Sequence, residues 1–145
     1  MTIAMTPHER EAFLAGVHVG VLSVEDPERA PLAVPVWYAY EPGGTVDVIT
    51  GRDSVKADLL RAAGRFSLCA QTEEPPYGYV SVEGPITDVV DPALPESLRA
   101  LAYRYLGPEF GELYLAATKD DAPEGVMFRL APERWRTADF TKQYG

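Results

Sequence analysis

The chain has 145 residues, of which 46% are hydrophobic and 24% charged, and this composition is typical of one globular domain over residues 1–145. Its 22 acidic and 13 basic residues give a net charge of −9, which argues against a nucleic-acid or anionic-membrane partner. A single cysteine, Cys69, excludes an intrachain disulfide and a multi-cysteine zinc site. We expect a cytoplasmic protein, because the sequence shows neither a signal peptide nor the roughly 18–20 apolar residues that span a bilayer.

The first half of the chain predicts a helix, then strands, then a second helix. A capping pattern at Thr6–Glu9 starts the first helix, which ends at Gly16. The turn residues Glu41–Gly44 separate two β-rich runs, so we expect these runs to pair as an antiparallel hairpin. The expected strands are residues 17–24, 32–40 and 45–50, and the second helix is 55–63, capped by Ser54 and ended by Gly64.

The second half predicts four more strands and further helices. A long strand is expected to break at Gly84-Pro85, where a bulge or bend would form. An acidic, solvated loop is expected at residues 119–125. The expected strands are residues 65–71, 79–90, 126–131 and 135–138, and the helices are 94–107 and 108–117. Most connections between strands are too short for a parallel crossover, so these elements predict a mainly β fold with peripheral helices, built on six or seven antiparallel strands that close as a barrel.

The segment from Thr50 to Lys56 has the features of a phosphate site. Thr50 ends a predicted strand, Ser54 begins a helix, and Lys56 lies in its first turn. Free N–H groups at a helix N-terminus, hydroxyl donors and an ammonium group suit a phosphate, and Arg52 could add a guanidinium. On these residues alone, an ordinary capped helix with a solvated lysine is the alternative. The window 52–65 has four basic residues against two acidic ones, the reverse of the whole chain.

Three motifs in order, Val-Pro-Val-Trp, Thr-x-x-x-Ser-x-Lys-Ala and a Phe-Ser-Leu strand, resemble those of the pyridoxamine 5′-phosphate oxidase-like split barrels. That family includes flavin- and deazaflavin-dependent oxidoreductases. The resemblance implies a split β-barrel that forms a homodimer with two cofactor sites at the interface. The matching segments cover nearly the whole chain: residues 17–24, 34–38, 50–59, 66–71, 79–84 and 132–139.

The resemblance assigns two groups of residues to a cofactor. The first group would hold its phosphate: Thr50, Ser54 and Lys56. The second group is a strand that would lie along its ring, mainly through the backbone: Val34, Pro35, Val36 and Trp37. The resemblance also implies that Trp135 lies near the cofactor.

Several residues that the true pyridoxamine 5′-phosphate oxidases of the family carry are missing here, including the His of a C-terminal Arg-x-His that grips the substrate phosphate. Their ring strand carries an Arg and a Lys that Val34–Ala39 lacks, a later strand carries a Gln, and their C-terminal Arg-x-His reads Arg136-Thr137-Ala138. We therefore expect an FMN-dependent oxidoreductase that acts on a different small organic substrate. One alternative is the deazaflavin coenzyme F-420, whose acidic tail would use Arg52, Arg61 and Arg65. Others are a non-catalytic binder of a flavin or tetrapyrrole, and a dimeric interaction module without a ligand.

No catalytic acid or base is assigned, because redox chemistry of this kind belongs to the cofactor. Gln71 is the expected hydrogen-bond donor near the ring, on a strand face that it shares with Cys69. We expect Cys69 itself to be a small core residue. No metal site is expected, since His8 and His18 are far apart and no carboxylates have matching spacing.

Overall fold

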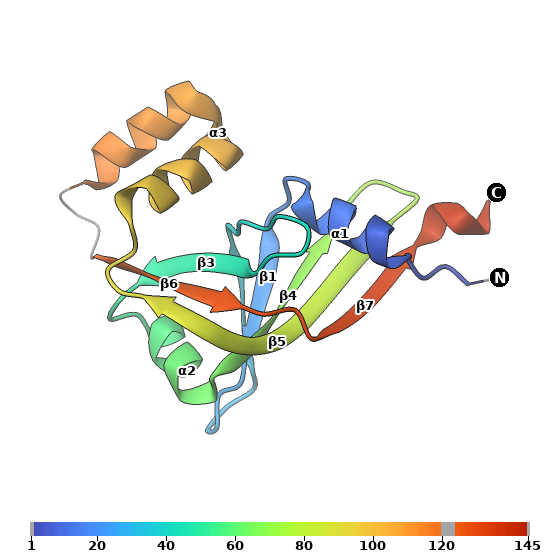
Figure 1. Ribbon diagram of the computed structural model, residues 1–145, viewed down its shortest axis with the longest axis horizontal. Coiled ribbons are helices and arrows are strands. Elements are labelled where there is room, and N and C mark those ends of the chain that lie inside the picture. The colour runs from blue at the N-terminus through green and yellow to red at the C-terminus, as the bar shows by residue number, and fades with distance from the viewer. Residues whose placement is uncertain (1, 120–123, 145) are drawn as a thin grey trace.

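The computed structural model describes residues 2–119 and 124–144. Within these ranges, seven strands form one curled antiparallel sheet, with three α-helices and one 3-10 helix around it (Figure 1). The predicted mainly β fold with peripheral helices is confirmed. Residues 120–123 of the expected acidic loop lie outside the described residues. None of the described helices is long and apolar enough to cross a membrane.

The elements follow the predicted order closely. Thr6 and Glu9 form the expected capping box of the first helix, and Ser54 caps the second through a hydrogen bond from Ala57 N. In chain order the elements are α1 (Pro7–Ala15), β1 (Gly20–Val24), β2 (Leu32–Val36), β3 (Val46–Gly51), α2 (Val55–Ala63), β4 (Arg65–Gln71), β5 (Gly78–Val90), α3 (Pro95–Thr118), β6 (Gly125–Leu130), β7 (Arg134–Asp139) and the 3-10 helix η1 (Phe140–Gln143).

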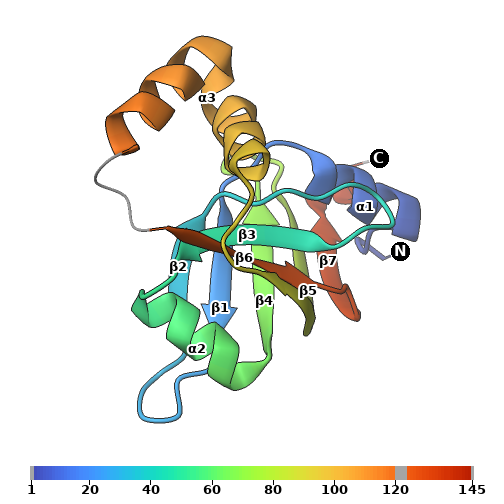
Figure 2. The same ribbon diagram turned by 60° about the vertical axis from the view of Figure 1, so that its left-hand side comes forward.

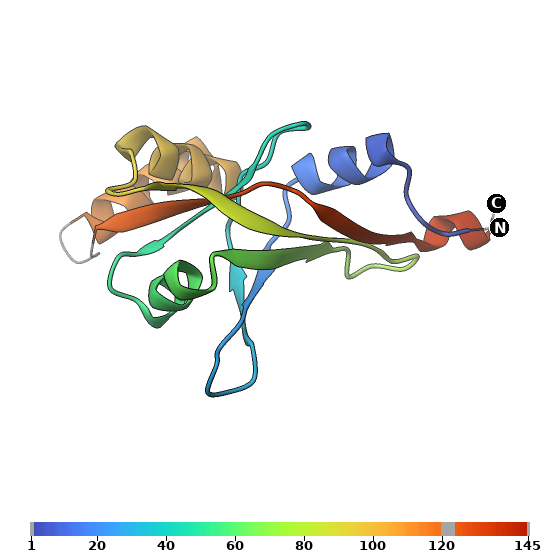
Figure 3. The same cartoon turned by 60° about the horizontal axis from the view of Figure 1, so that its bottom comes forward.

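Strand β5 joins the two parts of the sheet. The strands follow the order β2-β1-β4-β5-β6-β3, and β7 also pairs with β5. The first part of β5 pairs with β4 and β7, whereas its end, from Ile86 to Val90, pairs with β6. The β5–β6 ladder shifts register between Ile86 and Asp88. Because such irregularities increase the local twist, the sheet curls here into a split barrel (Figure 3).

The expected break of the long strand at Gly84-Pro85 is wrong. Strand β5 runs through both residues, and its irregularity comes two residues later. Gly84 instead makes room for another part of the backbone, because a Cβ atom there would lie 1.9 Å from the carbonyl oxygen of Ala131. Two hydrogen bonds fix this crossing: Ala131 N donates to Pro85 O at 2.9 Å, and Glu133 N donates to Glu83 O at 2.9 Å.

The expected hairpin between residues 32–40 and 45–50 is also wrong. Strand β2 ends at Val36 and pairs with β1, whereas β3 pairs with β6. Only a bridge between Ala39 and Asp47 links the two runs. The strand stops early because Tyr38 N donates to the hydroxyl of Tyr105 on α3 and not to a neighbouring strand.

The core lies inside the curl of the sheet. Alternate residues of β1, β3, β4, β5 and β6 point into it, and α2 closes one side with Ala57 and Leu60. Its largest fully buried side chains are Tyr38, Phe128, Leu14, Leu22, Leu60, Leu68 and Leu130. The opposite face of β1 and β2 is open, and Val19 and Val21 are exposed on the β1 side.

Helix α3 is a helical hairpin that stands over the β3 side of the sheet (Figure 2). The two predicted helices are both present, separated at Gly107, where φ is +80° and ψ is 167°. Glycine adopts this conformation without the steric cost that a side chain would add. The break turns the chain back, so both halves of α3 reach the same side of the molecule.

Candidate functional site

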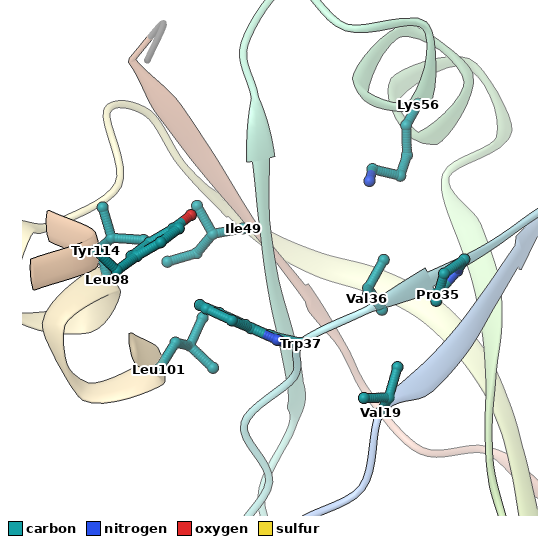
Figure 4. Close-up of a pocket in the computed structure, with 9 residues that line it drawn as sticks. All are labelled: Val19, Pro35, Val36, Trp37, Ile49, Lys56, Leu98, Leu101 and Tyr114. Atoms are coloured by element: carbon teal, nitrogen blue, oxygen red, sulfur yellow. The ribbon is translucent and has the colours of Figure 1, made fainter. Parts of the chain in front are cut away.

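A groove of about 350 Å³ lies between the ends of β2 and β3, the start of α2 and the inner side of α3. Figure 4 shows Lys56 at one end, with its nitrogen pointing into the groove, and Trp37 and Tyr114 toward the other end. The wall between them is apolar. The groove is lined by Val19, Pro35, Val36, Trp37, Ile49, Lys56, Leu98, Leu101 and Tyr114.

Lys56 brings a positive charge to this apolar groove. Partial burial lowers the pKa of its ammonium group, since desolvation disfavours the charged form. The ammonium forms no ion pair with any carboxylate of the described residues, so nothing offsets this cost there. A half-buried cation without a counter-ion favours the binding of an anion.

The hydroxyl groups of Thr50 and Ser54 lie at the N-terminal end of α2, the helix that carries Lys56. Thr50 is 9% exposed, and its Oγ1 is 3.2 Å from Ser54 Oγ. Ser54 Oγ also accepts from Ala57 N at 3.1 Å and donates to Gly51 O at 2.8 Å. The first N–H groups of an α-helix have no partner within it, and the helix dipole is positive there. The expected phosphate residues thus lie close together at the start of α2, but among them Lys56 alone lines the groove, and Thr50 is on the face of β3 opposite the groove-lining Ile49.

Arg52 does not line the groove. Its guanidinium pairs with Asp91 at 2.5 Å and with Glu124 at 2.8 Å, and its backbone N donates to Glu124 O at 3.0 Å. These partners raise the pKa of Arg52. The side chain therefore holds the β3–α2 turn against the end of β5 and the start of β6, away from the groove.

Trp37 connects α3 to the sheet through aromatic contacts. Its ring stacks on Tyr105, with the centroids 5.2 Å apart and the planes 5° from parallel, and on its other side Tyr114 lies 5.2 Å away at 56°. The hydroxyl of Tyr105 accepts from Tyr38 N at 3.0 Å and donates to His18 O at 2.7 Å. One aromatic cluster thus sets the position of the helical wall of the groove.

Replacing Tyr105 by phenylalanine should lower the free energy of unfolding by about 1–2 kcal/mol, because two buried backbone groups lose their partner while the ring stack stays. Urea unfolding followed by circular dichroism measures this change. The control is Tyr144→Phe, since Tyr144 is 80% exposed, and it should have no effect. Equal stabilities of the two variants would contradict the role of Tyr105.

The other expected site residues lie around or away from the groove. Val34 is half-buried on the same strand as Pro35 and Val36 but does not line the groove. Gln71 is exposed at the end of β4. Trp135 packs against Tyr40 and Arg10 and does not line the groove either.

Cys69 lies on the sheet face opposite the core, half-buried between Val21 and Ser81, so its reading as a core residue is wrong. Burial raises the pKa of its thiol. A thiol with a raised pKa is a poor nucleophile at neutral pH, which keeps Cys69 out of the chemistry of the site.

The sequence did not predict that α3 forms a wall of the groove. Leu98, Leu101 and Tyr114 of α3 form it, together with Ile49 of β3. The spacing of residues 94, 98, 101 and 105 predicts the helix but does not say what its apolar side covers. The alternation of β3 was a usable signal, since it places Ile49 on the face opposite the buried Val48 and Thr50.

These features define a split barrel with an apolar groove that ends at a lysine and a helix N-terminus. The sequence matches the family model described as pyridoxamine 5′-phosphate oxidase over residues 6–139. The chain belongs to this family. No curated protein matches the sequence.

Solved structures share the fold over most of the chain. A conserved hypothetical protein from Mycobacterium tuberculosis is 26% identical with a TM-score of 0.76, covering 99% of this chain and 90% of that one. An F420 reductase is 19% identical with a TM-score of 0.61, covering 87% and 94%. A FAD-binding protein from Mesorhizobium loti is 21% identical with a TM-score of 0.63, covering 94% and 96%. The last two likenesses concern the fold alone.

Proposed function

We propose that this chain is a cytoplasmic, homodimeric, FMN-dependent oxidoreductase that binds its cofactor in the groove. The observation that carries the proposal is Lys56, a half-buried ammonium group that faces an apolar groove and pairs with none of the described carboxylates. A phosphate beside Lys56 would supply the counter-ion and meet the N-terminus of α2.

The residues present fit a group that has a phosphate at one end and a flat ring at the other. Lys56, Thr50 and Ser54 would hold the phosphate. Pro35, Val36 and Trp37 would hold the ring, and the apolar wall would keep water from it. The flavin, when bound, supplies the capacity to accept and donate a hydride. The protein contributes binding, orientation and exclusion of water.

The substrate of this reaction is a small organic molecule other than pyridoxamine 5′-phosphate. Of the Arg-x-His that grips the substrate phosphate in the true oxidases, Arg136 matches the Arg, but Ala138 stands in place of the His. Among the described residues that line the groove, Lys56 is the one charged side chain, and the proposed cofactor uses it. This leaves the rest of the groove suited to an uncharged substrate.

Two alternative functions are compatible with the same fold. A deazaflavin has support from the F420 reductase among the similar structures. However, the basic residues expected to hold its acidic tail already have partners: Arg61 pairs with Asp58 at 3.4 Å, and Arg65 pairs with Glu133 at 3.2 Å. A non-catalytic flavin or tetrapyrrole carrier is supported by the groove itself, because Lys56 and Tyr114 are its only titratable groups among the described residues.

A second copy of the chain would cover an exposed apolar surface and so form the proposed homodimer. Val17 and Val19, just before β1, and Val21 within it are exposed, at 59%, 55% and 39%, and Val19 also lines the groove. An exposed apolar row of this kind is typical of a surface that another chain covers. In a dimer built on this face, the partner would border the cofactor groove.

The test is a titration of the purified chain with FMN and, separately, with coenzyme F-420. We expect FMN to bind with a change in its visible spectrum, and light scattering to give the mass of two chains. Tighter binding of F-420 would support the deazaflavin alternative, and binding without turnover against a panel of reductants and acceptors would support the carrier. Failure of both cofactors to bind at high micromolar concentration would refute the proposal.

A further inference from the structure

A second cavity, of about 740 Å³, lies beside the groove and under α3. Its apolar lining comes from β3, from the segment before α3 and from both halves of α3: Ile49, Ala93, Leu94, Leu98, Leu115 and Ala116. Ile49 and Leu98 line the groove as well, so these two side chains form a wall that the groove and the cavity share.

The charged groups of this cavity balance one another. Arg99 forms an ion pair with Glu112, which also accepts a hydrogen bond from the hydroxyl of Tyr103. Glu124 is held by Arg52 at 2.8 Å. With Lys119, the described lining carries two charges of each sign. Because these charges sum to zero and three of the four are already paired, the described lining offers a ligand no net charge, which favours an uncharged one.

The size of the cavity also indicates a ligand. Pockets that bind small organic molecules have volumes of roughly 300–1,000 Å³ and mostly apolar walls. The two halves of α3 diverge from the break at Gly107, and Ala93 and Ala116 contribute only methyl groups to the lining. The space is therefore left open by small side chains and by the turn of the helix.

We propose that this cavity binds an uncharged, apolar compound of two or three fused rings. It is the substrate cavity of the proposed oxidoreductase, because Ile49 and Leu98 line both this cavity and the cofactor groove. The substrate role rests on the proposed function, whereas the binding of the ring compound is independent of any cofactor.

The test uses 1-aminoanthracene, an uncharged three-ring probe whose fluorescence rises in apolar surroundings. We expect saturable binding to the wild-type chain and weaker binding of the anionic 2-anthracenecarboxylate. Ala116→Trp should fill the cavity and weaken probe binding by about tenfold or more. Its control is Ala117→Trp, because the neighbouring Ala117 is exposed like Ala116 but does not line the cavity. Ala117→Trp should bind the probe like the wild type.

Added FMN then separates the two proposals. In the wild type, bound FMN should quench the fluorescence of the bound probe, and Ala116→Trp should keep its affinity for FMN. Absence of saturable probe binding, or equal probe affinities of the two tryptophan variants, would overturn the cavity proposal. Probe fluorescence that bound FMN leaves unchanged would overturn its role as the substrate cavity. Failure of FMN to bind, with the probe still bound, would refute the cofactor proposal and the substrate role together and leave the ligand cavity supported.

Discussion

Replacing Lys56 by alanine is expected to weaken FMN binding by roughly 10- to 150-fold, the equivalent of about 1.5–3 kcal/mol for a charge-assisted phosphate contact. The ammonium group is half-buried and, among the described residues, has no carboxylate partner, so the bound phosphate would be its counter-ion. Fluorescence quenching of FMN measures the dissociation constant. Lys56→Arg should retain part of the affinity, because it keeps the charge but not the shape of the ammonium group.

The matched control is Arg61→Ala on the same helix. This variant removes the same charge, but Arg61 is exposed, pairs with Asp58 and does not line the groove. Its affinity for FMN should therefore stay within about twofold of the wild type, since exposed ion pairs contribute little. If the two alanine variants lose affinity equally, the effect is one of net charge, and Lys56 is not the phosphate ligand.

The pH dependence gives an independent check on Lys56. Desolvation lowers its pKa in the free protein, and a bound phosphate would raise it, because an adjacent opposite charge favours the ammonium form. FMN affinity is therefore expected to be full below the free pKa and to fall as the pH rises through it, starting at a lower pH than an ordinary lysine would give. The Lys56→Ala variant should lack this decline.

Replacing Gly84 by alanine is expected to cost about 3 kcal/mol or more in the free energy of unfolding, which corresponds to a fall of about 10 °C in the melting temperature. The added Cβ atom would lie 1.9 Å from Ala131 O, and two flanking backbone hydrogen bonds prevent that segment from moving away easily. Thermal unfolding followed by circular dichroism measures the effect.

Gly78→Ala on the same strand is the control for this substitution. A Cβ atom at Gly78 would lie 3.4 Å from Ala138 O, which is an ordinary contact, and the chain should keep its stability within about 1 kcal/mol. Equal melting temperatures for the Gly84 and Gly78 variants would show that the crossing of β5 by residues 131–133 is looser than this structure describes.

Local signals predicted the elements well. The capping residues and terminal glycines gave α1 and α2, and alternating side chains gave β4 with its observed bounds. The turn at Glu41–Gly44 is present as well, since Gly44 N donates to Glu41 O at 2.8 Å. The hairpin failed because a turn does not decide which strands pair. Strands β2 and β3 find better partners in β1 and β6, and contacts so distant in the chain leave no local pattern.

The same distinction applies to the site. Thr50, Ser54 and Lys56 lie within seven residues, so their proximity could be predicted from the order of a strand, a turn and a helix. Leu98 and Tyr114 come from a helix that begins 39 residues after Lys56, and nothing in their spacing connects them to Lys56. The ion pairs of Arg52 with Asp91 and Glu124 could not be predicted from the sequence either, because both carboxylates come close to Arg52 only in the folded chain.

Because the chain turns back at Gly107, different elements build the Lys56 end of the groove and the second cavity. The proposed phosphate end of the groove is built by β3 and α2, whereas most of the second cavity is built by the two halves of α3, and the shared wall by Ile49 of β3 and Leu98 of α3. Helix α3 is attached through the stack of Tyr105 on Trp37, the hydroxyl of Tyr105 and the guanidinium of Arg104, which donates to Ala15 O and Gly16 O. Substitutions along the inner side of α3 would therefore change which molecules fit beside the groove while the cofactor anchor stays as it is, so ligand preference and cofactor binding are separable properties of this chain.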